Sequence, residues 1–353
     1  MGERTFCLRV ATTMMLTYPV AAAFLSFLPC LIQAGSYRRA EHIVGNDFFH
    51  AFDWDAIPDP TNGRVNYTDK ATARALHLTT ATKDKFILRS DATTVLDPLG
   101  PGRNSVRLVS KRAYRTHVTV HDIAHMPTGC GTWPAVWEFG GEWPGGGEVD
   151  ILEGVNDQGP NQSALHTGPN CTMPAERDEF ETGTPIQIDC DATHNFNQGC
   201  VVQTPSDASY GPAFNEVGGG WYAMERTERF VKVWFWPRDS HAVPRDVRGV
   251  RGGGAYGALG YARSVLPKRQ LRPLRLGAAQ YYHQPHPLRR LCRQPRRLRT
   301  IRVSLNLYRW ALLPSFFDMM NMHMLRADFV NANPAALRHA YFEFNSVSVY
   351  TRM

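Results

Sequence analysis

The amino-acid sequence predicts an all-β fold, a sandwich of two sheets joined by many turns. Glycine and proline are frequent, with 29 and 24 among 353 residues, and this favours turns. Stretches with the 3.6-residue period of a helix are scarce, whereas short segments that alternate polar and apolar residues recur along the chain. The length admits one large domain or two ordinary ones.

The strands are expected in chain order. An aromatic-rich opening segment, 45–54, leads to a turn at 59–63 and a short strand at 64–67. Residues 105–110 and 117–123 alternate in polarity, which is the pattern of a half-buried strand. Further strands are expected over residues 149–152, 220–225, 230–236 and 340–350. Many short strands separated by turns, without an internal repeat, are typical of a sandwich.

The N-terminal residues 1–36 have the pattern of a secretory signal peptide. A positive start precedes an uncharged apolar run, 10–34, and Ala34-Gly35-Ser36 offers a small-residue cleavage point. The run is about long enough to span a membrane, so an uncleaved membrane anchor is the alternative. Two prolines interrupt the run and favour cleavage. We therefore expect a protein that is secreted, to the extracellular space or the cell wall.

Secretion implies disulfides and glycosylation. Five cysteines lie beyond the apolar run, so disulfides are expected, with one cysteine left over. They are Cys130, Cys171, Cys190, Cys200 and Cys292. Three asparagines begin N-x-S/T triplets, which are candidate glycosylation sites. They are Asn66, Asn161 and Asn170.

The most informative segment is Gly147-Glu148-Val149-Asp150-Ile151-Leu152-Glu153-Gly154, where three carboxylates interrupt an apolar strand. Burying charge is costly, so the acids need a reason to be there. Paired carboxylates at a short spacing suit glycosidic bond cleavage with retention, which uses a nucleophile and an acid/base about 5–5.5 Å apart. A solvated acidic strand or a calcium site is the alternative.

The spacing of the three acids requires a bulge. On a regular strand Glu148 and Asp150 face one side and Glu153 the other. A β-bulge between Asp150 and Glu153 would return Glu153 to the same side. Glu148 is then expected as the nucleophile, ionised at rest. Glu153 is expected as the acid, with its pKa raised by nearby negative charge, and Asp150 could share a proton with Glu148.

Aromatic side chains around this segment favour sugar binding, because their faces stack on the apolar faces of sugar rings. Trp133, Trp137 and Trp143 precede the acids, and Trp221 follows them. A single tryptophan is more often a core residue than a platform. No cofactor and no metal are expected.

These residues resemble glycoside hydrolase family 16, and in particular the fungal laminarinase-type endo-1,3(4)-β-glucanases. The segments that carry the resemblance are GCGTWPAVW at 129–137, WP at 143–144, GEVDILEGVN at 147–156 and LHT at 165–167. The match covers about residues 43–245 and 327–350.

The resemblance implies a concanavalin-like β-jelly-roll with a concave glucan cleft, and a single catalytic domain over 37–353. Glu148 corresponds to the nucleophile, Glu153 to the acid/base and Asp150 to an assisting acid. Trp137, Trp143 and His166 match substrate-contacting positions.

Residues 247–326 depart from the family. Within 247–317 there are fifteen Lys or Arg and no Asp or Glu, although the whole chain carries only +7. Neither strand nor helix periodicity is evident, and the family's W-G-T-P, F-P-x-x-x-C-D and C-G-D-x-A-G motifs and an apolar strand are missing. Residues 259–293 read one base out of frame, with permitted codons, restore such motifs. We hypothesise a frame-shifted segment followed by a retained intron, with a disordered basic insert as the alternative.

The expected activity is endo-hydrolysis of laminarin-like and mixed-linkage β-1,3(4)-glucans. A cell-wall glucan transglycosylase uses the same acids and differs in the acceptor. An inactive glucan-binding relative is a further alternative because of the disrupted segment. The expected partner is β-glucan polysaccharide, with no nucleic acid, and a membrane only if the N-terminal segment is uncleaved. A monomer is expected.

Overall fold

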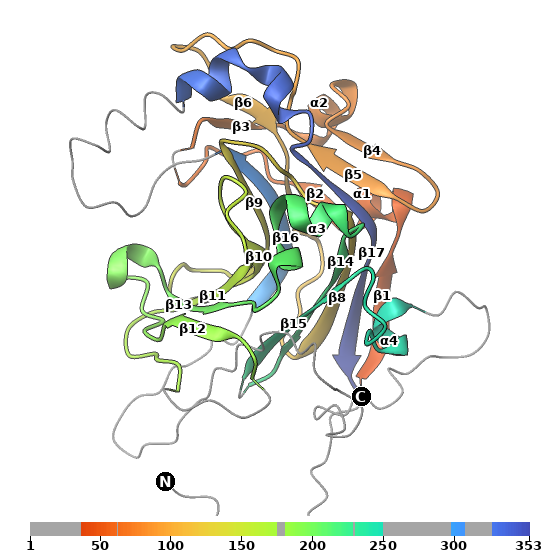
Figure 1. The fold of residues 1–353 in the computed structure, drawn as a ribbon, viewed down its shortest axis with the longest axis vertical. Coiled ribbons are helices and arrows are strands. Elements are labelled where there is room, and N and C mark those ends of the chain that lie inside the picture. Colours follow the sequence, from red (N-terminus) through yellow and green to blue (C-terminus); the bar gives the residue numbers. More distant parts are fainter. Residues whose placement is uncertain (1–36, 62, 175–180, 229, 250–297, 308–326) are drawn as a thin grey trace, which may run out of the picture. The chain divides into compact units, whose positions relative to one another are not determined.

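The computed structural model describes residues 37–61, 63–174, 181–228, 230–249, 298–307 and 327–353, with the backbone alone for 298–307. In these ranges the strands form two large sheets, which Figure 1 shows side by side, and one small sheet. No helix in these ranges is long and apolar enough to cross a membrane. The expected signal peptide or anchor at 1–36 lies outside the described residues.

The seven-stranded sheet has the order β15-β14-β8-β17-β5-β4, with β1 paired to β17. Its strands are β1 (Tyr37–Ile43), β4 (Thr79–Ala81), β5 (Phe86–Arg89), β8 (His117–His125), β14 (Gly220–Arg226), β15 (Val231–Pro237) and β17 (Tyr341–Arg352). Strand β15 shows why these segments form strands. Val231, Val233 and Phe235 alternate toward the core, while Lys232 and Trp234 are more exposed.

The eight-stranded sheet has the order β12-β13-β11-β10-β9-β16-β7-β2. Its strands are β2 (Phe52–Trp54), β7 (Arg107–Ser110), β9 (Thr132–Gly140), β10 (Glu148–Glu153), β11 (Gln162–His166), β12 (Thr184–Gln187), β13 (Cys200–Gln203) and β16 (Leu298–Leu307). Strand β10, which carries the three acids, lies between β9 and β11. Both of its neighbours are antiparallel to it.

The remaining elements are short. Strands β3 (Val65–Tyr67) and β6 (Arg103–Ser105) pair in parallel. The labelled helices are α1 (Phe48–Ala51), α2 (Lys70–Ala75), α3 (Gly211–Glu216) and α4 (Arg245–Arg248), with 3-10 turns η1 (Gly45–Asp47), η2 (Asn195–Asn197), η3 (Asp207–Ser209) and η4 (Pro334–Leu337). Residues 327–332 are helical as well. The side chain of Asp69 caps the N-terminus of α2 by accepting from the backbone N–H of Thr72 at 2.7 Å.

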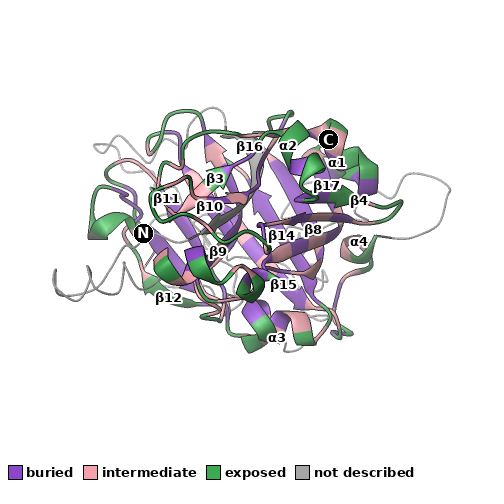
Figure 2. Ribbon diagram, turned by 90° about the horizontal axis from the view of Figure 1, so that it is seen from above, coloured by how far each residue is buried: buried purple, intermediate pink, exposed green. Residues whose placement is uncertain are grey.

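A hydrophobic core joins the two large sheets. Val136, Val149 and Leu152 from one sheet belong to the same buried cluster as Tyr222 and Met224 from the other. A polar contact also crosses the core, because Nε2 of His117 lies 2.9 Å from Oε1 of Glu138. Figure 2 shows that burial follows the strands and that the short helices and loops are more exposed. The predicted two-sheet all-β fold is confirmed.

Each of the predicted strands falls on strand residues, although 105–110 is broken at Val106 into β6 and β7. No strand was expected between residues 247 and 317, but residues 298–307 form β16. There β16 pairs with β9 on one side and β7 on the other, so it lies inside the sheet. Pairing on both edges stabilises a strand through its backbone, whatever the arginine content. Residues 250–297 and 308–326 lie outside the described residues.

Candidate active site

The three acids gather on the face of the eight-stranded sheet that points away from the core. Glu148 pairs in register with His166 of β11, and Asp150 with Trp137 of β9. Residues paired in register share a face, and so do residues two apart on one strand. Glu148, Asp150, Trp137 and His166 therefore lie on one face, while Val149 between the acids is in the core.

A β-bulge brings Glu153 to this face, as predicted. The register between β10 and β9 shifts after Asp150, because Leu152 pairs with Val136 and Ile151 is the extra residue. Glu153 then pairs with Ala135, two residues from Trp137. Without the extra residue the side chain of Glu153 would point into the core.

Each acid has a polar neighbour of its own. Nε1 of Trp133 donates a hydrogen bond to Oε1 of Glu153 at 2.8 Å. Nε2 of His166 lies 3.2 Å from Oδ2 of Asp150, an ion-pair distance. Asp150 is 1% exposed, whereas the two glutamates are half-buried. The glutamates are thus the two acids that a substrate can reach.

Burial raises the pKa of all three carboxyl groups, and the charge of Asp150 adds to this effect for the two glutamates. Burial, followed by the charge of Asp150, raises the pKa of Glu148 and of Glu153 to about 8. Burial raises the pKa of Asp150 to about 7, opposed by a hydrogen bond with Glu148. For Glu153 the raised pKa agrees with the prediction, but burial is its main cause. For Glu148 the raised pKa runs against the expectation that this acid is ionised at rest and favours the expected sharing of a proton with Asp150, and both expectations stay predictions.

The structure places three of the four predicted tryptophans beside the acids. Trp133 contacts Glu153, and a hydrogen bond from Trp143 lowers the pKa of Glu148 against the effect of burial. The Trp143 side chain is 46% exposed. Trp137 is nearly buried under the guanidinium of Arg107, which lies 5.0 Å from its ring centroid. Trp143 is therefore the most accessible of these rings.

Trp221 was predicted as a substrate-binding residue and does not belong to the site. It lies on β14, in the other sheet, and is 7% exposed. The guanidinium of Arg238 lies 3.9 Å from its ring centroid. Because this cation covers the ring, Trp221 is a packing residue, which is the more frequent role of a single tryptophan.

Two asparagines near the acids were missed as site residues. Asn161 is fully buried and its side chain bonds the backbone of β10, so it cannot carry the glycan that its triplet suggested. Asn66 and Asn170 are exposed. Oδ1 of Asn197 lies 3.1 Å from Nδ1 of His166. Neither role has a local signal in the sequence, because the partners are distant in the chain.

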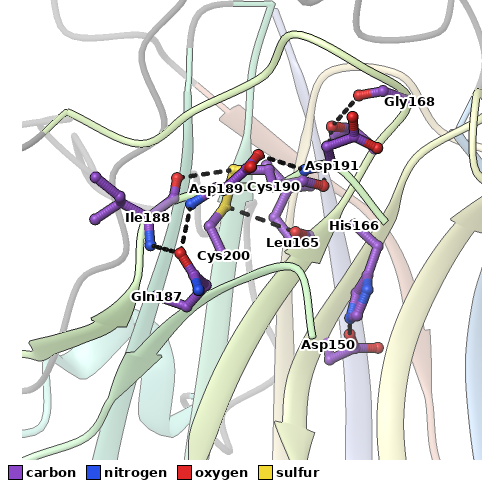
Figure 3. The surroundings of a disulfide bond; sticks show 11 residues. Asp150, Leu165, His166, Gly168, Gln187, Ile188, Asp189, Cys190, Asp191 and Cys200 are labelled. Atoms are coloured by element: carbon purple, nitrogen blue, oxygen red, sulfur yellow. Dashed lines mark hydrogen bonds and ion pairs between the residues drawn. A yellow bond between two sulfur atoms is a disulfide. The ribbon is translucent and has the colours of Figure 1, made fainter. Parts of the chain in front are cut away.

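A disulfide closes the loop that holds Asn197. Cys190 and Cys200 are bridged across a separation of 10 residues, which confirms that the chain forms disulfides. Figure 3 shows the bridge next to Leu165 and His166, with His166 pointing toward Asp150. Among the described residues, no group of three or more His, Cys, Asp or Glu is arranged to hold a metal ion.

A two-sheet sandwich with three carboxyl groups and several tryptophans on one sheet face defines the class of glycoside hydrolase domains. Within that class, the chain belongs to glycoside hydrolase family 16. A family model described as "XgeA-like, catalytic GH16 domain" matches residues 52–255.

Known proteins agree with this assignment. An endo-1,3(4)-β-glucanase of Arthroderma benhamiae is 41% identical over 230 residues, which is 63% of this chain and 49% of the relative. Laminarinase 16A of Phanerochaete chrysosporium, solved with 6-O-glucosyl-laminaritriose in its donor and acceptor sites, is 44% identical. Its TM-score is 0.75, over 90% of this chain and all of that one.

A solved family 16 β-1,3-glucosyltransferase, described as elongating, is 31% identical with a TM-score of 0.71, over 90% of this chain and all of that one. The sandwich is thus the jelly-roll of the laminarinases, as expected. The chain spans about half the length of the curated relatives it matches.

Proposed function

We propose that the chain is an endo-acting β-1,3(4)-glucanase that cleaves laminarin-like and mixed-linkage glucans with retention. The observation that carries the proposal is the bulge at Ile151, which puts Glu153 on the same sheet face as Glu148 and Asp150. Similarity to a laminarinase along 90% of the chain supports the substrate class.

In the first step a carboxylate oxygen of Glu148 attacks the anomeric carbon and forms a glycosyl ester. The bond from that carbon to the leaving oxygen breaks, and Glu153 gives its proton to this oxygen. The raised pKa of Glu153, about 8, keeps that proton available near neutral pH. Glu148 becomes the attacking carboxylate when the proton it shares with Asp150 resides on Asp150.

In the second step water attacks the same carbon and the ester bond to Glu148 breaks. Glu153, now ionised, takes a proton from the water, so both acids return to their starting states. The bond between Trp133 and Glu153 is suited to this exchange, because it stabilises the ionised form without removing the proton at rest.

Transglycosylation is the second candidate, supported by the likeness to a solved glucosyltransferase. It uses the same ester intermediate, and a sugar hydroxyl replaces water in the second step. An inactive glucan-binding relative is less well supported, because all three acids are present and lie on one face. Product analysis separates hydrolase from transferase, since only the transferase makes products longer than the substrate.

The test measures reducing sugar released from laminarin and mixed-linkage glucan. It uses the protein as written, a frame-restored version, and Glu148→Gln of each. We expect Glu148→Gln to lower kcat at least about 10³-fold, because it removes the nucleophile. Activity that survives Glu148→Gln would contradict the mechanism. Activity only in the frame-restored protein would support the frame-error hypothesis.

We further propose that the protein is secreted and acts on glucan as a monomer. The Cys190–Cys200 disulfide supports secretion, because disulfides persist in oxidising compartments. One chain supplies all three acids and their polar neighbours, which supports a monomer. N-terminal sequencing of protein recovered from culture medium tests cleavage near residue 36, and light scattering tests the monomer.

A further inference from the structure

The bulge in β10 leaves backbone groups in need of partners on the β11 side. The register between β10 and β11 covers Glu148, Val149 and Asp150 and ends there. Beyond it, the C=O of Ile151 and the N–H of Glu153 lie in a buried part of the sheet. A buried backbone group without a partner is strongly unfavourable, so something must replace the missing ladder bonds.

The side-chain amide of Asn161 replaces both bonds. Its Oδ1 accepts from the N–H of Glu153 at 2.9 Å, and its Nδ2 donates to the C=O of Ile151 at 3.0 Å. Oγ of Ser163 donates to the same C=O at 2.9 Å. The C=O of Ile151 needs a donor and the N–H of Glu153 needs an acceptor, and the asparagine amide carries both on one carbon atom.

Asn161 is itself fixed by its backbone. Its N–H donates to Oγ of Ser209 at 2.9 Å, and its C=O accepts from the N–H of Thr204 at 2.8 Å. The residue is 0% exposed. Two segments distant from the acids therefore hold the amide in place. The amide in turn bridges Ile151 and Glu153, the residues on either side of Leu152.

We propose that Asn161 is a positioning residue for Glu153, an inference that rests on the proposed function. By bonding Ile151 and Glu153 together, the amide holds the bulged backbone in the one register that turns Glu153 toward the outer face. Loss of the amide frees this backbone, so Glu153 moves away from the oxygen it must protonate. Proton transfer is then impaired while attack by Glu148, which precedes the bulge, is preserved.

The test compares two substrates that differ in their need for an acid. Laminarin has a sugar leaving group that must be protonated, whereas a 2,4-dinitrophenyl β-laminaribioside does not need this. For Asn161→Ala we expect kcat/KM on laminarin to fall about 10²-fold and that on the aryl glycoside less than about 5-fold. Azide should speed turnover of the aryl glycoside by the variant, because azide attacks the glycosyl ester without a general base. The exposed neighbour gives the control, and Gln162→Ala should match the wild type on both substrates.

Asn161→Asp keeps the shape of the side chain and replaces its amide by a carboxyl group that can ionise. Its protonated carboxyl group can still donate to Ile151 and accept from Glu153, whereas the ionised group repels the C=O of Ile151. Activity should approach that of the wild type at acid pH and decline as pH rises, with an ionisation absent from the wild-type profile. This variant decides the matter if Asn161→Ala does not fold.

The outcomes are separable. If the wild type cleaves neither substrate, the proposed function fails and this inference with it. If the wild type is active and Asn161→Ala loses activity equally on both substrates without a response to azide, the function stands and the positioning role is overturned. A wild-type pH profile for Asn161→Asp overturns it as well.

Discussion

The imidazole of His166 approaches the central acid of the site, with Nε2 3.2 Å from Oδ2 of Asp150. Both residues are nearly buried, and His166 is the register partner of Glu148 on the adjacent strand. Its charge interaction lowers the pKa of Glu148 and of Glu153 and so opposes burial and the charge of Asp150. His166 is therefore placed to limit how far the two glutamates hold their protons.

Replacing His166 by Gln should raise the pKa of both glutamates further, because the opposing interaction is lost while burial remains. The alkaline limb of kcat/KM on laminarin should move to higher pH, and kcat at neutral pH should fall about 10-fold because less Glu148 is ionised. The exposed His241→Gln is the matched control. A pH profile of His166→Gln that coincides with that of the control would contradict this role.

Two tryptophan substitutions separate the site from the packing. Burial raises the pKa of Glu153 and the bond from Trp133 opposes it, so Trp133→Phe should raise that pKa further. We expect kcat/KM to fall about 10-fold, because the free energy of one hydrogen bond to a charged group corresponds to about this factor. Trp221→Phe, in the other sheet, should change kcat/KM less than about twofold. Equal effects of the two changes on kcat/KM would refute the assignment of Trp221 to packing.

The raised pKa of Glu148 predicts how stability depends on pH. The folded value of about 8 exceeds the unfolded value of 4.5, so folding binds a proton between these pH values. The stabilisation is complete below pH 4.5 and is lost as pH rises through 8. Glu148→Gln removes this loss, so at pH 9 the variant should exceed the wild type by about 1–3 kcal/mol, with no difference at pH 4.

Urea unfolding at the two pH values measures this difference. The exposed Glu142→Gln is the control and should show the wild-type dependence. A variant that loses as much stability as the wild type between pH 4 and pH 9 would show that Glu148 is not the group that binds the proton.

The disulfide-closed loop should act on stability and on the site together. Replacing Cys190 and Cys200 by Ser opens a loop whose closure is worth about 2–3 kcal/mol at this length. It also releases Asn197, the neighbour of Nδ1 of His166, so the pH profile should shift in the direction of His166→Gln. Chemical denaturation and the pH profile measure the two effects. The control Cys130→Ser, at an exposed cysteine, should leave the stability and the pH profile unchanged. A wild-type pH profile in the double variant would show that the loop does not act on His166.

The sequence predicts the parts of the site that are local. The spacing of Glu148, Asp150 and Glu153 requires a bulge because strand periodicity is two, and the structure has it. Alternation likewise locates β15 and β17. These predictions succeed because a single strand carries both the pattern and the function.

The parts that sequence reasoning missed depend on neighbouring strands. Asn161 bonds residues 8 and 10 positions earlier only because β11 folds back against β10. Trp221 has the composition of a sugar platform, but its burial is decided by Arg238, whose position the sequence does not reveal. Strand β16 was missed although residues 301–307 alternate between apolar and polar, because the long arginine-rich sequence that precedes them shows no such alternation.

Strand β16 gives the last prediction, which concerns the support of the acidic strand. It lies between β9 and β7, and β9 in turn pairs with β10, so the sheet under the acids depends on it. Val303 pairs in register with Val136 and with Leu108. Proline at an interior strand position removes a donor and does not fit between two partners. Val303→Pro should lower stability by about 3 kcal/mol or more and abolish laminarin cleavage.

Val303→Thr is the matched control, since it keeps the backbone N–H and the β-branched shape, and it should stay much closer to the wild type. Thermal unfolding followed by near-ultraviolet circular dichroism measures both variants. If Val303→Pro unfolds at the same temperature as Val303→Thr, β16 does not fill the position between β9 and β7. The missing apolar strand of the reading-frame hypothesis would then be the better candidate for that position, and the frame-restored protein should be the more stable of the two chains.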